Sequence, residues 1–99
     1  MCGAPKQTEQ LPPGIDLARE TVLIGRVLVG DQPVGGAFVR LLDRTGEFTA
    51  EVVSSATGDF RFFAGPGSWT LRALSRAGTG ETLLTAVSPG VHHAEVFVD

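Results

Sequence analysis

The sharpest candidate for covalent chemistry is the single cysteine of the chain, Cys2. A thiolate attacks disulfides and persulfides at a rate that depends on its ionised fraction and on access. Cys2 lies beside the amino terminus on a stretch that we expect to be exposed, and Lys6 is the nearest basic residue. One hypothesis is that Cys2 accepts sulfur from a persulfide. The alternative is a terminal cysteine that has no chemical role.

The only two histidines, His92 and His93, are adjacent. Adjacent residues of a strand point to opposite faces, so the pair does not favour a shared metal ion, and no zinc-ligand spacing accompanies them. The sequence also lacks a nucleophile-elbow motif and a glycine-rich phosphate loop. We therefore expect no catalytic residues, no metal and no cofactor, and we predict that the protein is not an enzyme.

Arginines and large apolar residues share one alternating set of positions in four segments of the chain. Four arginines are costly to bury between two sheets, so this set is predicted to face outward. An apolar face that carries arginine is typical of an interface, and the alternative is that the N-terminal arm covers it. The residues proposed for this partner face are Arg26, Phe38, Arg40, Leu42, Arg61, Phe63, Arg72 and Leu74.

Seven short, β-branched or aromatic segments must position these residues, and glycine- or proline-containing turns separate most of them. Such spacing, at 8 to 12 residues, is typical of a sandwich, and no window keeps a helical period. We predict an all-β, seven-stranded Greek-key sandwich of two packed antiparallel sheets. The expected strands are residues 21–29, 36–43, 48–55, 59–64, 69–75, 81–87 and 91–98.

The complementary alternating set is free of charge and is predicted to form the core. Trp69 follows a Gly-Pro-Gly turn, which we expect to deliver its ring into the sandwich. The predicted core residues are Leu23, Gly25, Val27, Val29, Ala37, Val39, Leu41, Phe60, Phe62, Trp69, Leu71 and Ala73.

Composition narrows the function classes. The 99 residues make one domain, in which residues 1–19 read as a flexible polar arm and residues 20–99 as the sandwich. A net charge of −3 argues against nucleic-acid binding, and no apolar run approaches the ~18 residues of a membrane helix. The first ten residues contain no hydrophobic stretch and the chain has one cysteine, so we expect a cytoplasmic protein.

Residues 20–75 resemble the transthyretin-like and carboxypeptidase-regulatory-like sandwiches. The resemblance rests on Leu-x-Gly-x-Val at 23–27, PVGGAFVRL at 33–41 and TGDFRFFAGPGSWTLRA at 57–73. Trp69 stands where that pattern usually has tyrosine. The resemblance implies the same sandwich fold, but a fold shared by such different proteins implies no function.

A second resemblance spans the chain through its opening MCGAPKQ, the stretch from Arg40 to Val53, and SATGDFRFFAGPGSWTLRAL at 55–74. These segments resemble an actinobacterial family of unknown function labelled SseC, whose genes lie beside a rhodanese-type thiosulfate sulfurtransferase. The resemblance implies a role in sulfur metabolism and assigns no catalytic residue.

Three functions follow from these observations. The first is a non-catalytic accessory protein that binds a rhodanese-type sulfurtransferase. The second is a sulfur carrier that takes a persulfide on Cys2, and the third is a purely structural homo-oligomer. The first and third use the partner face, whereas only the second needs the cysteine.

The carrier hypothesis predicts a covalent change at Cys2. Incubation of the full chain with thiosulfate and the sulfurtransferase should add about one sulfur atom, because thiol–persulfide exchange needs only an accessible thiolate. Intact-mass spectrometry measures the gain, and Cys2→Ser should abolish it. An unchanged mass while the enzyme is turning over would reject the carrier role.

Overall fold

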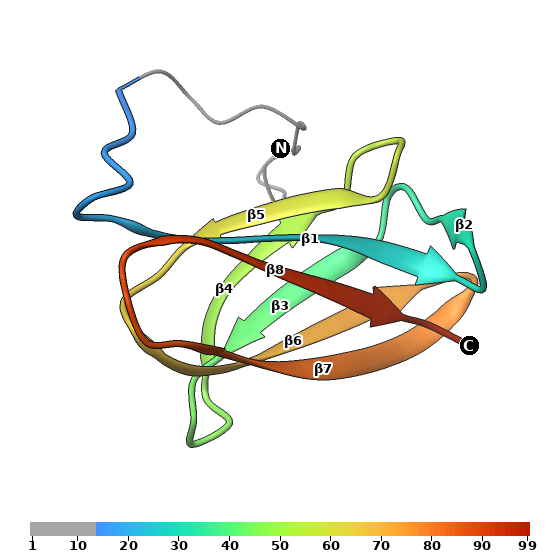
Figure 1. The fold of residues 1–99 in the computed structure, drawn as a ribbon. Coiled ribbons are helices and arrows are strands. Elements are labelled where there is room, and N and C mark those ends of the chain that lie inside the picture. Colours follow the sequence, from blue (N-terminus) through green and yellow to red (C-terminus); the bar gives the residue numbers. More distant parts are fainter. Residues whose placement is uncertain (1–13) are drawn as a thin grey trace, which may run out of the picture.

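The computed structural model describes residues 14–99, which form two sheets packed face to face (Figure 1). The strands are β1 (Thr21–Val29), β2 (Gln32–Pro33), β3 (Phe38–Leu42), β4 (Phe48–Val53), β5 (Asp59–Phe63), β6 (Gly67–Ser75), β7 (Gly78–Ala86) and β8 (Gly90–Phe97). The predicted all-β sandwich is confirmed, with no helix among the residues described. The two-residue β2 lies inside the expected turn at 30–36.

One sheet has the order β4-β3-β6-β7 and is antiparallel throughout. In the other sheet, β1 pairs with β8 along one edge and with β5 and β2 along the other. The β1–β8 pair is parallel, over Thr21–Leu28 and Gly90–Phe97, which corrects the expectation of two antiparallel sheets. Alternation along a strand carries no information on strand direction, so the sequence pattern could not reveal this pair.

The core lies between the sheets and follows the predicted alternation closely. Its largest fully buried side chain is Phe60, whose ring lies 6.1 Å from that of Phe62. Predicted residues confirmed in the core cluster are Leu23, Val27, Ala37, Val39, Leu41, Phe60, Phe62, Leu71 and Ala73. Val96 and Val98 from the C-terminal segment complete it on the β8 side.

Three positions of β1, Val22, Leu28 and Val29, differ in burial from what alternation predicts. Val29 is 37% exposed, because it is the last residue of β1 and borders the turn. Alternation turns Leu28 outward, but it is buried, since Pro33 and Phe97 flank it in register on the two neighbouring strands. Alternation predicts direction, whereas burial also depends on neighbours across the sheet.

Trp69 is only partly buried, although it packs against the core cluster as predicted. Its indole N–H donates a hydrogen bond of 2.9 Å to the carbonyl of Gly65. A tryptophan with one apolar side and one hydrogen-bonded edge sits well at such a boundary. The ring therefore braces the β5–β6 turn against the core.

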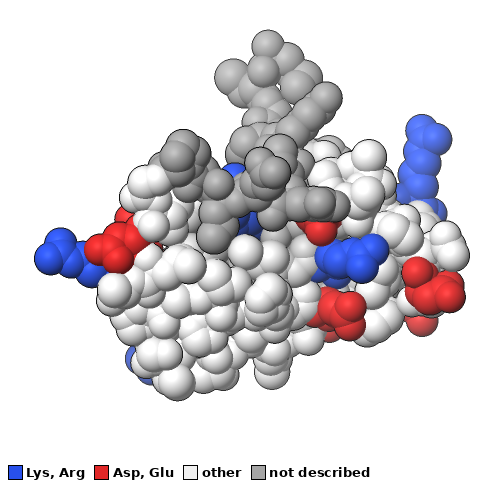
Figure 2. Space-filling model, turned by 45° about the horizontal axis from the view of Figure 1, so that its top comes forward, with Lys and Arg blue, Asp and Glu red and all other residues white. Residues whose placement is uncertain are grey.

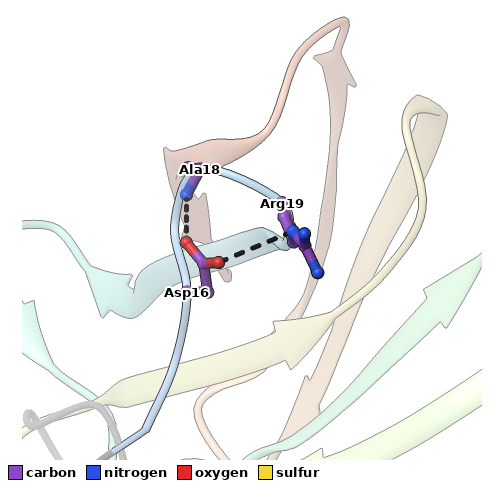
Figure 3. Close-up of polar contacts among 3 residues, drawn as sticks. All are labelled: Asp16, Ala18 and Arg19. Carbon is purple, nitrogen blue, oxygen red and sulfur yellow. Dashed lines mark hydrogen bonds and ion pairs between the residues drawn. The ribbon is translucent and has the colours of Figure 1, made fainter.

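The described residues before β1 form a turn rather than a strand (Figure 3). The backbone N–H of Ala18 donates to Asp16 Oδ1 at 3.0 Å, and Arg19 Nε lies 3.8 Å from Asp16 Oδ2. The proposed arm–domain boundary, between residues 19 and 20, thus lies just before β1 begins. Residues 1–13 of that arm lie outside the described part of the chain.

Two close backbone approaches place β8, one against β1 and one against β7. A Cβ on Gly25 would overlap the carbonyl oxygen of Ala94 in β8, and it would lie 2.5 Å from the Phe60 ring. A Cβ on Gly80 would likewise overlap the carbonyl of Phe97. Glycine is therefore required at both positions for β8 to lie where it does.

Gly25→Ala should destabilise the fold by about 2 kcal/mol, because the added methyl must displace backbone or an aromatic ring in a packed interior. Urea unfolding followed by Trp69 fluorescence measures the loss. Gly65→Ala is the matched control, since nothing lies within 4 Å of its Cβ position. Equal stability of the two variants would show that the β1–β8 contact is not tightly packed.

Candidate functional site

The residues predicted to share one outward face lie on opposite sides of the sandwich. Arg26, Arg61 and Phe63 are on the outer side of the sheet that contains β1. The outer side of β4-β3-β6-β7, here called the β3–β6 face, carries four others, which are Phe38, Arg40, Arg72 and Leu74. Period-2 alternation separates inside from outside, but it does not say which sheet a strand joins.

Leu42 belongs to the β3–β6 face by alternation but is only 6% exposed, which corrects its proposed role as a contact residue. The register between β3 and β4 shifts between Leu41 and Leu42, and Leu42 then lies between Phe48 and Thr70. These neighbours on both sides leave little of its side chain open to solvent. Leu42 therefore supports the face instead of presenting itself on it.

A row of four charged side chains crosses the middle of the β3–β6 face. Strand register gives the order Glu51, Arg40, Arg72, Glu81 from β4 to β7. Arg40 Nε lies 2.7 Å from Glu51 Oε2, and Arg72 Nη2 lies 3.3 Å from Glu81 Oε1. Exposed ion pairs add little to stability, so this row is better suited to recognition than to folding.

Apolar rows lie on both sides of the charged row. One contains Val53, Phe38, Leu74 and Thr79, and the other contains Phe48, Leu42, Thr70 and Leu83. Phe38 is 48% exposed, Phe48 62% and Leu83 78%. A solvated sheet face is normally polar, whereas aromatic residues and arginine together are enriched at protein interfaces.

Ser54 fixes the loop that leads into Phe38. Its hydroxyl accepts a hydrogen bond from the backbone N–H of Ala37 at 2.9 Å and donates one to the carbonyl of Val34 at 2.8 Å. Ser54 is buried, so these bonds are shielded from water. They hold the start of β3 and thereby the exposed phenyl ring at one end of the face.

The turn between β3 and β4 holds the other end. Asp43 Oδ1 accepts hydrogen bonds from the backbone N–H of Thr45 at 2.8 Å, from its hydroxyl at 2.6 Å, and from the N–H of Glu47 at 3.1 Å. The Thr45 hydroxyl is the main cause that holds the pKa of Asp43 below its ordinary value, and the N–H of Glu47 follows. This turn delivers Phe48 opposite Leu42.

A surface hollow of about 760 Å³ borders the β3–β6 face at Phe38 and Leu74. Val29 and Pro33 line its far side, and Arg76 contributes from the β6–β7 turn. The exposure of Val29 is thus part of a continuous apolar region.

The opposite face, on the sheet of β1, has a different pattern. Arg26 lies in register between Glu95 of β8 and Asp59 of β5, and with His93 these residues line a hollow of about 520 Å³. Figure 2 brings the top of Figure 1 forward and shows acidic and basic groups next to one another on this side. The guanidinium of Arg61 stacks on Phe63, 5.7 Å from its ring centroid.

Two titratable groups of this sheet, Asp59 and His92, are held by hydrogen bonds to neighbouring turns. Asp59 Oδ2 accepts hydrogen bonds from the hydroxyls of Ser55 and Thr57, which closes the β4–β5 turn. His92 and His93 point to opposite faces as predicted, and His92 Nε2 donates to the Ser88 carbonyl at 2.8 Å. Within residues 14–99, no three His, Cys, Asp or Glu side chains are grouped to hold a metal ion.

Cys2 lies outside the described residues, so the sulfur-carrier hypothesis stays a prediction. In the part of the chain that the structure covers, no helix is long and apolar enough to cross a membrane. Sequence reasoning missed Phe48, Leu83 and the two glutamates of the charged row. One signal was present, because Leu83 and Leu84 are adjacent in a strand and one of them must face outward.

Comparison with known proteins gives a family but no activity. The sequence profile of a family described as "Protein of unknown function (DUF1416)" matches residues 2–98. Two Mycobacterium tuberculosis proteins, uncharacterised proteins Rv0814c and Rv3118, are each 63% identical to this chain over 99 residues. Each match covers 99% of this chain and 99% of the relative. An uncharacterised protein of Mycolicibacterium smegmatis is 61% identical, over 89% of this chain and 99% of its own.

Solved structures share the fold. A DUF3823 family protein from Parabacteroides merdae has a TM-score of 0.62 at 18% identity, over 82% of this chain and 46% of its own, so this chain spans about half of it. The dioxygenase domain of a dioxygenase–carbohydrate-binding fusion from Streptomyces sp. SirexAA-E also has a TM-score of 0.62, at 12% identity. The match covers 98% of this chain and 90% of that domain. Identities this low establish the sandwich and nothing about chemistry.

Proposed function

This chain belongs to the DUF1416 family of proteins of unknown function, and on that premise we propose that it is a non-catalytic binding protein that docks a protein partner on its β3–β6 face. The observation that carries the proposal is the exposure of Phe38, Phe48 and Leu83 on either side of a row of ion-paired arginines. Large apolar patches in contact with water mark interaction sites on soluble proteins.

The composition of the face supports a protein as its partner. Energetic hot spots of interfaces are enriched in aromatic residues and arginine, and they lie at the centre of the buried patch. Arg40 and Arg72 occupy the centre, and Phe38 lies beside them in the next row. The charged row supplies orientation, while the apolar rows supply the area that leaves water on binding.

The resemblance to the SseC-like family suggests the partner, a rhodanese-type thiosulfate sulfurtransferase, and with it a role as an accessory protein of sulfur metabolism. A cytoplasmic location is part of this proposal, because a single cysteine suits a reducing compartment. In this proposal the sandwich binds the enzyme through its β3–β6 face, and Cys2 on the N-terminal segment reacts with the enzyme.

Phe38→Glu should weaken binding to the purified thiosulfate sulfurtransferase of the same organism by about tenfold or more, because a buried charge replaces an aromatic contact. Isothermal titration calorimetry measures the dissociation constants. Phe63→Glu is the matched control, because Phe63 is 49% exposed against 48% for Phe38 and lies on the other sheet.

Equal losses in the two variants, or a loss only in Phe63→Glu, would place the interface elsewhere and reject the β3–β6 face. Failure of the wild-type chain to bind the sulfurtransferase would reject that partner. Sedimentation of the wild-type chain as a dimer that Phe38→Glu converts to monomer would instead favour the structural homo-oligomer.

A further inference from the structure

The centre of the β3–β6 face holds two arginines next to each other. Arg40 and Arg72 are direct partners in the antiparallel β3–β6 pair, where opposite Cα atoms lie about 5 Å apart. Like charges in this position repel, and each arginine is compensated by a glutamate on its far side. Positive charge is therefore concentrated in the middle of the row and negative charge at its two ends.

Both guanidinium groups keep hydrogen-bond donors for another acceptor. Arg40 donates its Nε–H to Glu51, while Arg72 directs Nε and Nη2 toward Glu81. A guanidinium carries five N–H groups, so these contacts use only some of the hydrogen-bond donors of each arginine. The side chains are 46% and 44% exposed, which leaves the centre of the row accessible from outside.

We propose that this arginine pair binds a side-chain carboxylate of the docked partner, which deepens the proposed function and rests on it. The carboxylate belongs to an extended segment that lies along the strands, with apolar residues two positions before and two positions after it. Its oxygens accept N–H bonds from Arg40 and Arg72 together, and charge-assisted bonds of this kind are among the stronger ones.

The spacing follows from the geometry of the face. Phe38 and Leu42 lie two residues before and after Arg40, which places their rows about 6.7 Å to either side of the charged row. A strand packed on a sheet in the aligned manner crosses it at about 30°, and its own side chains repeat at the same interval. An apolar–x–acidic–x–apolar segment therefore meets the row of Phe38 and Leu74, the arginine pair, and the row that has Phe48 and Leu83 at its ends, in succession.

Other occupants fit this face less well. A second copy packed through the same face, about a two-fold axis at its centre, would set arginines against arginines. A nucleic acid would bring successive phosphates toward Glu51 and Glu81 at the ends of the row, and the chain has a net charge of −3. A single carboxylate between apolar side chains matches both the charge distribution and the flanking rows.

Panning of a random linear peptide library on the immobilised full chain tests the proposal whichever protein the partner is. We expect enriched peptides to carry Asp or Glu flanked at two residues on both sides by apolar residues. Synthetic copies of these peptides should bind the wild-type chain about tenfold more weakly when the acid is replaced by its amide. The unmodified peptides should bind the double variant Arg40→Gln/Arg72→Gln about tenfold more weakly than they bind the wild-type chain. Arg26→Gln, on the opposite face, is the control and should leave the affinity unchanged.

The outcomes separate the two proposals. Peptides that need Phe38 but show no preference for an acid would overturn the carboxylate contact and leave the docking face standing. Peptides insensitive to both Phe38→Glu and the arginine double variant would overturn the docking face itself, as would the absence of any enrichment. Displacement of the peptide by inorganic phosphate but not by acetate would overturn the choice of a carboxylate.

Discussion

The approach of β8 to β1 at Gly25 is the constraint on which the rest of the sandwich depends. These two strands are separated by most of the domain, and they pair in parallel from Thr21 to Leu28. Gly25 provides the space that the Ala94 carbonyl and the Phe60 ring occupy. With β8 in this position, Val96 and Val98 close one side of the core, and Thr79 and Asp99 exchange backbone hydrogen bonds between the two sheets.

The β3–β6 face is a consequence of this packing. Once Val39, Leu41 and Leu71 fill the interior, alternation turns the residues between them outward. The antiparallel registers of neighbouring strands then align those residues into rows, and Arg40 meets Arg72 only because β3 pairs with β6. The residues that we propose for recognition, from β4, β3, β6 and β7, thus form one surface that neither hairpin carries alone.

The two outer faces of the sandwich differ in what surrounds their exposed apolar residues. On the β1 side, Val22 and Leu28 are buried, Phe63 and Phe97 reach solvent, and charged groups surround a hollow. On the β3–β6 side, phenyl rings and a leucine reach solvent around compensated arginines. Dioxygenase domains and a DUF3823 protein share this sandwich at 12–18% identity, so the fold alone does not indicate a function.

Alternation and turn residues were sufficient to predict from the sequence the number of long strands and most of the core, because the side-chain period of a strand is a local property. Tertiary structure alone decided that Arg26 and Arg40 lie on opposite faces, that Leu42 is covered and that β1 runs parallel to β8. Strand partners are chosen by contacts between distant segments, and a period-2 pattern is the same whichever partner a strand has. The proposed partner surface therefore became visible only once register had aligned four strands.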